Sequence, residues 1–136
     1  MSDLNNAMDS AASGMRAQAT RMRIISENLA NARSTGDTPG EDPYRRQIPL
    51  FGDMVDRESG ARTVEVRKVA PDMAEFGLKF DPNHPAADDK GYIKVSNVNP
   101  LIEMMDMREA QRSYEANLNA MNASRRMATS TLELLR

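Results

Sequence analysis

The chain has 136 residues, with 18 basic and 20 acidic side chains that leave a formal net charge of −2. This length predicts a single domain, and the balanced charge gives no long-range attraction to nucleic acid or an anionic membrane. The absence of cysteine excludes disulfides, thiolate metal sites and a cysteine nucleophile, and the single histidine excludes a His–His metal pair. Eleven Met, with three Phe, three Tyr and no Trp, indicate long helices that need partners rather than an aromatic core.

Two series of residues spaced seven apart predict a long N-terminal helix from Leu4 to Ala32. Together they occupy the a and d positions of a heptad repeat. One series is Met8, Met15, Met22 and Leu29, and the other is Leu4, Ala11, Gln18, Ile25 and Ala32. Gly14 is a weak position for a helix, and Gly36 and Pro39 come after the predicted end.

Residues 33–99 predict a loop and then a small β-rich segment. The loop RSTGDTPGEDP is rich in Gly and Pro, which cannot continue a helix. Short strands are predicted over residues 44–51, 63–69, 76–80 and 91–95. A segment with so few large apolar residues has only a marginal core of its own.

A second long helix is predicted from Pro100 to the C-terminus, with Asn99 as its N-cap. No Gly or Pro interrupts residues 101–136. Two further heptad series lie along this helix: Met107, Tyr114, Met121, Ala128 and Leu135, and Met104, Gln111, Leu118, Arg125 and Leu132.

These elements predict a mainly α fold with a small β-rich insert. The two long terminal helices form an antiparallel helical pair whose broad Met, Ala and Leu faces complete their core on assembly. The predicted domains are a helical assembly domain, residues 1–33 plus 100–136, and a loop and β-rich middle segment, residues 34–99.

The residues that could take part in catalysis or metal binding have no suitable partner residues near them in the sequence. His84 lies between two prolines in DPNHP and is better interpreted as a turn residue than as a base or metal ligand. Asp81, Asp88 and Asp89 lack the glutamate that closes a calcium loop, so a solvated loop is the better interpretation. No catalytic constellation, metal site, cofactor site or small-molecule substrate is predicted.

Two arginine pairs, Arg45–Arg46 and Arg125–Arg126, are too short for a nucleic-acid interface, which needs a larger basic stripe with aromatic residues. We interpret them as surface charge or as salt bridges to a neighbouring subunit.

The beginning of the chain, MSDLNNAMDS, is acidic and has no apolar core, so no cleaved secretory signal is expected. The apolar runs are also too short for a membrane span.

Four motifs in one order resemble a known family over nearly the whole chain. The stretch SGMRAQATRMRIISENLANARSTGD, residues 13–37, resembles the signature of the bacterial flagellar axial proteins, and PYRRQIPLF, residues 43–51, is similar to the adjoining stretch of rod proteins. DPNHPAADDKGYIKVSNVNP, residues 81–100, and MMDMREAQRSYEANLNAMNASRRM, residues 104–127, resemble the proximal rod proteins of the FlgC type. Ser96, Pro100 and the loop 36–42 depart from the family pattern.

The resemblance implies a structural, non-enzymatic subunit of the flagellar basal-body rod. It implies export through the flagellar type III apparatus without a cleaved signal, and location in the periplasm-spanning rod. The implied partners are copies of itself, other rod proteins, and the junction with the export gate and inner-membrane ring.

We expect the assembly interface to use apolar heptad residues of both helices and two asparagines carried over from the family motif. These residues are Met15, Met22, Ile25, Asn28, Leu29, Asn31, Met107, Tyr114, Leu118, Met121 and Leu132. The alternatives are a different axial subunit, a cytoplasmic coiled-coil adaptor or export chaperone, and an enzyme acting on the cell wall. The last would need a pair of placed carboxylates.

Overall fold

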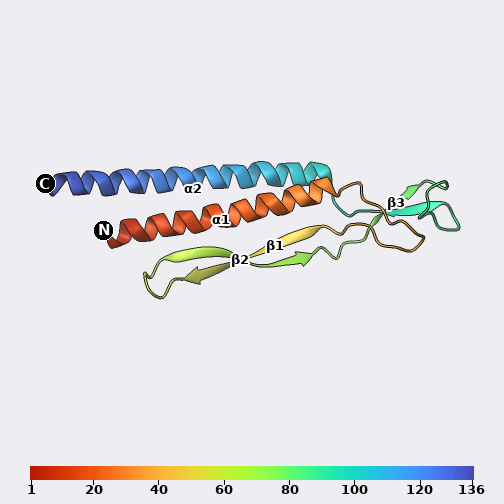
Figure 1. Cartoon of the computed structure of the whole chain (residues 1–136), viewed down its shortest axis with the longest axis horizontal. Helices are drawn as coiled ribbons and strands as arrows, with labels where there is room; N and C mark the ends of the chain where they lie inside the picture. The colour runs from red at the N-terminus through yellow and green to blue at the C-terminus, as the bar shows by residue number, and fades with distance from the viewer. The chain divides into compact units, whose positions relative to one another are not determined.

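A computed structural model describes all residues, 1–136. In chain order the elements are α1 (Ser2–Ala30), β1 (Gln47–Val55), β2 (Arg62–Pro71), β3 (Gly77–Phe80), β4 (Tyr92–Val95) and α2 (Pro100–Leu134), shown in Figure 1. β1 pairs with β2 and β3 pairs with β4, which makes two separate two-stranded sheets. The predicted fold class, mainly α with a small β-rich insert, is confirmed.

The predicted elements differ from the observed ones mainly at the first strand. The sequence predicts an extended segment over residues 44–51, whereas β1 begins at Gln47 and continues to Val55. The backbone amides of Tyr44 and Arg46 donate to the side chains of Ser34 and Asn97, at 3.4 and 2.7 Å, so they are not available to a neighbouring strand. Hydrogen bonds between a backbone amide and a side chain distant in sequence cannot be recognised from the alternation of apolar and polar residues.

The chain divides into two compact units that cut across its helices. Unit 1 comprises Met1–Met22, Pro49–Lys68 and Met107–Arg136, and unit 2 comprises Arg23–Ile48 and Val69–Asp106. Both helices therefore contribute to both units. The predicted division into terminal helices and a middle segment partitions the chain by element type instead, and it stays a prediction.

In unit 1 the two helices pack antiparallel. The Gly14 backbone lies so close to α2 that a Cβ there would be 2.6 Å from Asn117 Nδ2. About two turns further along α1, Arg21 Nη2 lies 3.4 Å from Glu109 Oε2. Residue numbers thus rise along α1 as they fall along α2. Gly14 weakens the isolated helix but allows α2 to approach closely, and the small side chain of Ala110 on α2 is fully buried.

The β1–β2 hairpin of unit 1 is attached to α1 through a serine. Ser13 Oγ donates to Ser10 O at 2.7 Å and accepts from the Val64 amide of β2 at 3.1 Å. The Asp56 amide donates to the Ala61 carbonyl at 2.9 Å to close the hairpin. Ala61 is buried, whereas much of the hairpin is exposed.

In unit 2, β3 and β4 are antiparallel, with Gly77 opposite Val95 and Phe80 opposite Tyr92. The Phe80 and Tyr92 rings meet edge to face, 5.3 Å between centroids. Gly91 has a φ of 84°, and a Cβ there would lie 2.8 Å from the Phe80 ring, so the position requires glycine.

In the connection between β3 and β4, the polar side chains of His84 and Asp88 bond to nearby backbone, as expected of turn residues. His84 Nδ1 accepts from the Ala86 amide at 3.0 Å, and Nε2 lies 3.2 Å from Thr35 Oγ1. Asp88 Oδ1 accepts from the amides of Lys90 and Tyr92, each at 2.9 Å. Both side chains thus hold backbone in place.

α2 begins where the sequence predicts. Asn99 Oδ1 accepts from the Leu101 amide at 3.1 Å, and the Asn99 carbonyl accepts from the Glu103 amide at 3.0 Å. This is the N-cap arrangement, with Pro100 at the first helical position. Neither α1 nor α2 has a stretch long and apolar enough to cross a membrane.

The loop after α1 is closed by Glu41. Its Oε2 accepts from the amides of Asp37 and Thr38 at 2.9 and 3.2 Å. These two backbone hydrogen bonds lower the pKa of the Glu41 carboxyl below its ordinary value. A Cβ on the buried Gly36 would lie 2.7 Å from the Glu41 carbonyl oxygen, so the loop folds tightly back on itself.

We expect this closure to depend on pH. The bonds favour ionised Glu41, so they are fully present above the ordinary pKa of 4.5 and are lost as pH falls through the lowered value. In an NMR titration, the amide shifts of Asp37 and Thr38 should change with a midpoint below 4.5. In a Glu41→Gln variant these amides should no longer show that titration. A midpoint at or above the ordinary value would contradict the closure.

Candidate assembly interface

Asn28, near the end of α1, substitutes for a β-strand partner of Gln47. Its Nδ2 donates to the Gln47 carbonyl at 2.9 Å, and its Oδ1 accepts from the Gln47 amide at 3.0 Å. One side-chain amide thereby satisfies both backbone groups of the first residue of β1. Asn28 is 1% exposed, so the loss of these bonds would not be compensated by water.

Tyr44 adds a further hydrogen bond to the side-chain amide of Asn28. Its hydroxyl donates to Asn28 Oδ1 at 2.9 Å. Burial raises the pKa of the Tyr44 hydroxyl, and the negative charges of Glu27 and Glu103 raise it further. The tyrosine therefore remains protonated and able to donate.

Glu103, in the first turn of α2, is fully buried and paired with Arg46. Arg46 Nε donates to Glu103 Oε1, while Asn28 Nδ2 lies 3.4 Å from Glu103 Oε2. The other guanidinium nitrogens lie 3.3 Å from Asp72 and 3.4 Å from Asp106. We call Asn28, Tyr44, Arg46, Gln47 and Glu103 the polar cluster of unit 2.

The charge of Arg46 is stabilised by these surroundings. Burial alone would lower the pKa of the guanidinium, but the carboxylates of Glu103 and Asp72 outweigh that effect and raise the pKa. Breaking a buried pair on one side leaves an uncompensated charge, so Arg46 and Glu103 depend on each other.

Arg45 also binds within the chain. Its Nη1 donates to the carbonyls of Asp72 and Ala74, and its guanidinium lies 4.2 Å from the centre of the Phe76 ring. The Arg45–Arg46 pair therefore holds the segment after β2 in place, and the salt bridges of Arg46 run to this chain's own carboxylates.

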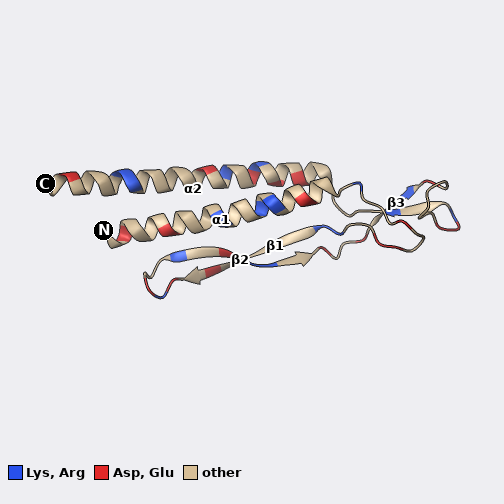
Figure 2. Ribbon diagram, viewed as in Figure 1, with Lys and Arg blue, Asp and Glu red and all other residues tan.

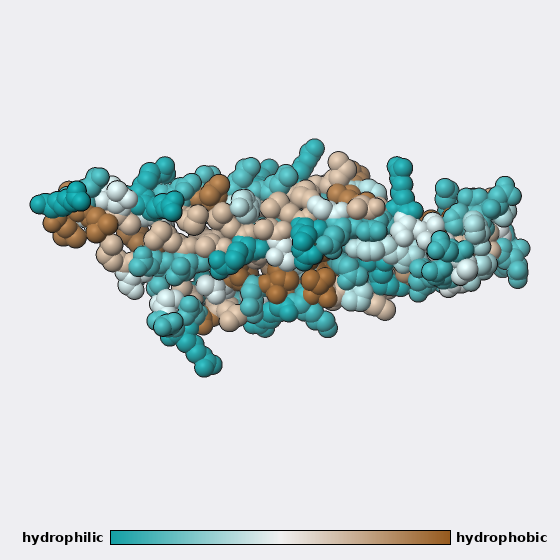
Figure 3. All heavy atoms as spheres, in the orientation of Figure 1, coloured by the Kyte–Doolittle hydropathy of each residue, from teal (hydrophilic) through white to brown (hydrophobic).

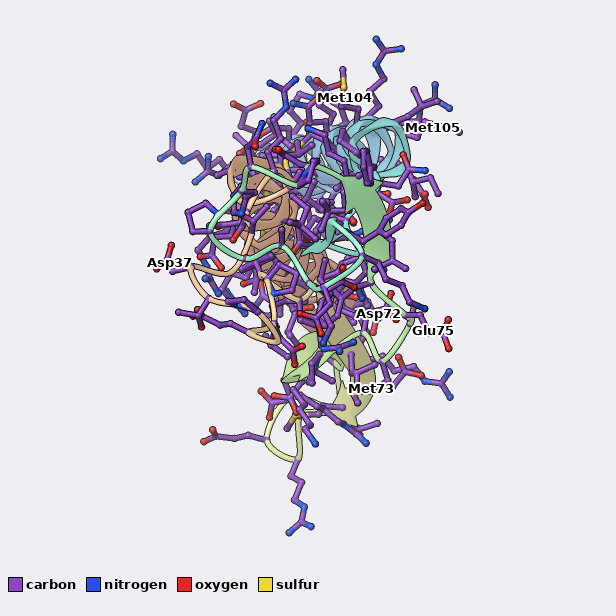
Figure 4. The ribbon with its side chains drawn as sticks, turned by 90° about the vertical axis from the view of Figure 1, so that its right-hand side faces the viewer. Asp37, Asp72, Met73, Glu75, Met104 and Met105 are labelled. Carbon is purple, nitrogen blue, oxygen red and sulfur yellow. The ribbon has the colours of Figure 1, made fainter.

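Large apolar side chains remain exposed around the start of α2 in unit 2. Leu101, Ile102, Met104 and Met105 are each at least half exposed. Met104 and Met105 are labelled in Figure 4, where they project outward from the helix. Contiguous exposed apolar side chains are common at protein–protein interaction surfaces.

Unit 1 exposes apolar side chains on two elements. On β1 they are Leu50, Phe51, Met54 and Val55. Near the end of α2 they are Met127, Leu132, Leu134 and Leu135, where apolar atoms are visible in Figure 3. Charges of both signs are spread along both helices, as Figure 2 shows, so apolar contacts distinguish these surfaces more than charge does.

Comparison with known protein sequences links this chain to the flagellar rod. The family model "Flagella basal body rod protein" matches residues 8–40, and "Flagellar basal body rod FlgEFG protein C-terminal" matches residues 89–134. Over its whole length the chain is 52% identical to the flagellar basal-body rod protein FlgC of Agrobacterium fabrum, of which it covers 98%. The chain belongs to the FlgC family of flagellar basal-body rod proteins.

More distant FlgC proteins align over the same length. The chain is 39% identical to FlgC of Aquifex aeolicus, with 98% of both chains covered. It is 36% identical to FlgC of Bacillus subtilis, with 95% of this chain and 96% of that protein covered.

The expected interface residues of this FlgC-family chain fall into three groups by exposure. Ile25 and Asn28 are buried within the chain itself. Asn31 and Leu132 are exposed. The others are partly buried: Met15, Met22, Leu29, Met107, Tyr114, Leu118 and Met121.

Asn28 and Asn31, both carried over from the family motif, have different partners. Asn31 Nδ2 donates to the Glu27 carbonyl of its own helix at 2.8 Å, in solvent. Asn28 joins α1 to β1 and approaches Glu103.

The buried pair of Glu103 and Arg46 was not predicted from the sequence. The available signal was a pair of carboxylates, Glu103 and Asp106, in the first two turns of a helix, combined with an arginine pair elsewhere. Carboxylates in a first helical turn are common because they favour the helix dipole, so that signal is weak by itself.

We expect Asn28→Ala to destabilise the protein by about 2–4 kcal/mol, because two backbone groups of Gln47 and the Tyr44 hydroxyl lose their partner. Asn31→Ala is the matched control, and its exposed bond should be worth less than about 1 kcal/mol. Urea unfolding of the purified full chain measures both. Equal effects of the two substitutions would show that Asn28 does not join α1 to β1.

Proposed function

We propose that this chain is a structural subunit of the flagellar basal-body rod and that it transmits torque from motor to hook. The proposal is carried by the full-length identity of 52% to a FlgC rod protein. The exposed apolar residues on β1 and α2 support it, because they give one subunit several faces on which neighbours can pack.

In this proposal the terminal helices, residues 1–33 and 100–136, form the assembly domain, and residues 34–99 form a loop and a small β-rich middle segment. Neighbouring subunits, both further copies and other rod proteins, cover the partly buried heptad methionines. Met15 and Met22 are such positions on α1, and Met107 and Met121 are such positions on α2. Methionine suits this role because it adapts to irregular partner surfaces.

The mechanical argument is that long helices with shared apolar seams resist sliding. α2 has 35 residues and α1 has 29, so each helix offers several turns of contact to its neighbours. Interdigitated side chains along such seams oppose shear because every layer must be separated at once. In this proposal the subunit completes its core only when it assembles.

The role is proposed to be non-enzymatic, without metal or cofactor. Both ring nitrogens of His84 and the carboxylate of Asp88 are used to hold backbone and a neighbouring hydroxyl. We further propose, from the family relationship, export through the type III apparatus without a cleaved signal and contact with the export gate and inner-membrane ring junction.

The experiment that tests this proposal is quantitative mass spectrometry of washed hook–basal bodies from the source cell. A rod subunit should be retained at a low, fixed ratio to the hook protein, and its N-terminal peptide should be uncleaved. Absence from basal bodies together with abundance in the cytoplasm would instead support a coiled-coil adaptor or export chaperone.

A substitution at an exposed interface position tests the shared seam separately from folding. Leu132 is 54% exposed, so Leu132→Asp should leave unfolding of the isolated chain unchanged within about 0.5 kcal/mol. A buried unpaired charge at a subunit contact should nevertheless abolish incorporation into the rod. Swimming of a complemented deletion strain measures the assembly effect.

Leu132→Met is the control for this position, because it changes the side chain but keeps it apolar. It should support swimming like the native chain. Normal swimming with Leu132→Asp would contradict a seam at this end of α2.

A further inference from the structure

In unit 2, β3 is an edge strand, because it pairs with β4 on one side and with no strand on the other. Residues 77–80 are all exposed, so the rest of the chain leaves this free side open. The far side of β4, in contrast, is occupied. There Thr35 forms a bridge with Val95. The Tyr92 carbonyl also accepts from the Asp88 amide at 2.9 Å, so only the β3 edge of this sheet is unpaired.

The hydrogen bonds of the sheet show which backbone groups of β3 point to its free edge. Directly after β3, the Asp81 amide donates to the Gly91 carbonyl at 2.9 Å. The direction of the backbone groups alternates along a strand, so Lys79 also points toward β4. The amides and carbonyls of Leu78 and Phe80 therefore point away from β4, to the free edge. No hydrogen bond from another part of the chain reaches these groups.

The same two residues of β3 also expose apolar side chains. Leu78 and Phe80 are 69% and 61% exposed, and Tyr92, directly opposite Phe80, is 43% exposed. Side chains two apart on a strand share a face, so these three lie on one face of the sheet. Lys94, also on this face, pairs with a carboxylate of the loop after α1. Ile93, on the other face, is buried. β3 thus presents unpaired backbone and exposed apolar side chains at the same place.

These two features together fit an extended segment and not a helix. The backbone groups of a helix are bonded within the helix, so only a strand can pair with alternate outward amides and carbonyls. The residues of such a strand beside Leu78 and Phe80 must be apolar, because they extend the exposed face. The residue between them lies beside Lys79, which makes no ion pair within the chain. An acidic or uncharged residue fits that position, whereas a basic residue would be repelled.

A second copy of β3 does not fit this edge. The antiparallel register that uses both Leu78 and Phe80 places Lys79 opposite Lys79 of the second copy. Like charges directly opposite each other destabilise a strand pair, and lysine in an edge strand opposes self-pairing. A two-fold contact also closes on itself, whereas a rod grows through heterologous contacts that repeat. The occupant is therefore a segment of different sequence.

We propose that an extended segment of a neighbouring axial subunit adds to the free edge of β3 as a further strand of the β3–β4 sheet. This segment carries apolar residues beside Leu78 and Phe80 and an acidic or uncharged residue beside Lys79. The outward amides of β3 bond to water in the free subunit and to the neighbour in the rod. The inference rests on the proposed rod function and names the β3 edge as one of its subunit contacts.

Hydrogen exchange of single amides, read by mass spectrometry with electron-transfer fragmentation, tests the strand addition directly. In the free chain the Leu78 and Phe80 amides should exchange faster than the Lys79 amide, which points toward β4. In purified hook–basal bodies the exchange of both should slow by roughly tenfold or more, because both amides are then paired. Equal exchange of Leu78 and Lys79 in the free chain would overturn the proposal. Unchanged exchange of Leu78 and Phe80 in basal bodies would overturn it as well.

A proline at position 78 removes one outward amide and leaves the bonds between β3 and β4 in place. Proline is tolerated in an edge strand where its nitrogen faces solvent. Leu78→Pro should therefore leave the urea midpoint of the free chain unchanged. Its retention in hook–basal bodies should fall by roughly tenfold or more, because the added strand loses a donor and meets the proline ring. Leu78→Val, which keeps the amide and an apolar side chain, is the matched control and should be retained normally.

A lower urea midpoint for Leu78→Pro would show that this amide is already bonded in the free subunit. Normal retention of Leu78→Pro, or equal loss with Leu78→Val, would show that no strand pairs with the backbone of β3. Each of these results overturns the strand addition while the native chain still assembles, so the rod function stands. Failure of the native chain to appear in basal bodies would overturn the function itself.

Discussion

The pairing of one asparagine side chain with the two backbone groups of Gln47 is the contact on which unit 2 depends. Asn28 provides a donor and an acceptor from a helix, where a strand would normally provide them, and so sets where β1 begins. Glu103 and Arg46 join the start of α2 to the same place. A helix end, a strand start and a second helix start are therefore held together by groups that are largely or wholly removed from water.

The elements could be predicted well from the sequence, and the reason lies in their local signals. Heptad spacing and the Asn99–Pro100 start located both helices to within about two residues, because periodicity and capping are local properties. Alternating valines located β2. The first strand was misplaced because Tyr44 and Arg46 donate to side chains distant in sequence, with separations of 10 and 51 residues.

The interface was harder to predict than the fold. Heptad positions identify apolar faces but do not say which part of a face is covered within the chain. Ile25 is covered by its own subunit, whereas Leu132 is not, although both occupy heptad positions. Gly14 shows that the sequence also hides packing contacts. The sequence identifies it only as a weak helix residue, whereas in the structure it is where α1 lies close to Asn117 of α2. Only the three-dimensional arrangement separates these cases.

The sequence distances within the polar cluster also have a consequence for folding order. The Asn28–Gln47 contact closes a separation of 19 residues, whereas contacts to Glu103 close separations of 57 and 75. Shorter loops cost less chain entropy to close, so we expect α1 and the start of β1 to associate before α2 docks. Until α2 docks, Arg46 would remain solvated. In a chain that emerges N-terminus first, we therefore expect the docking of α2 to be the late step that buries Glu103 against Arg46 and stabilises unit 2.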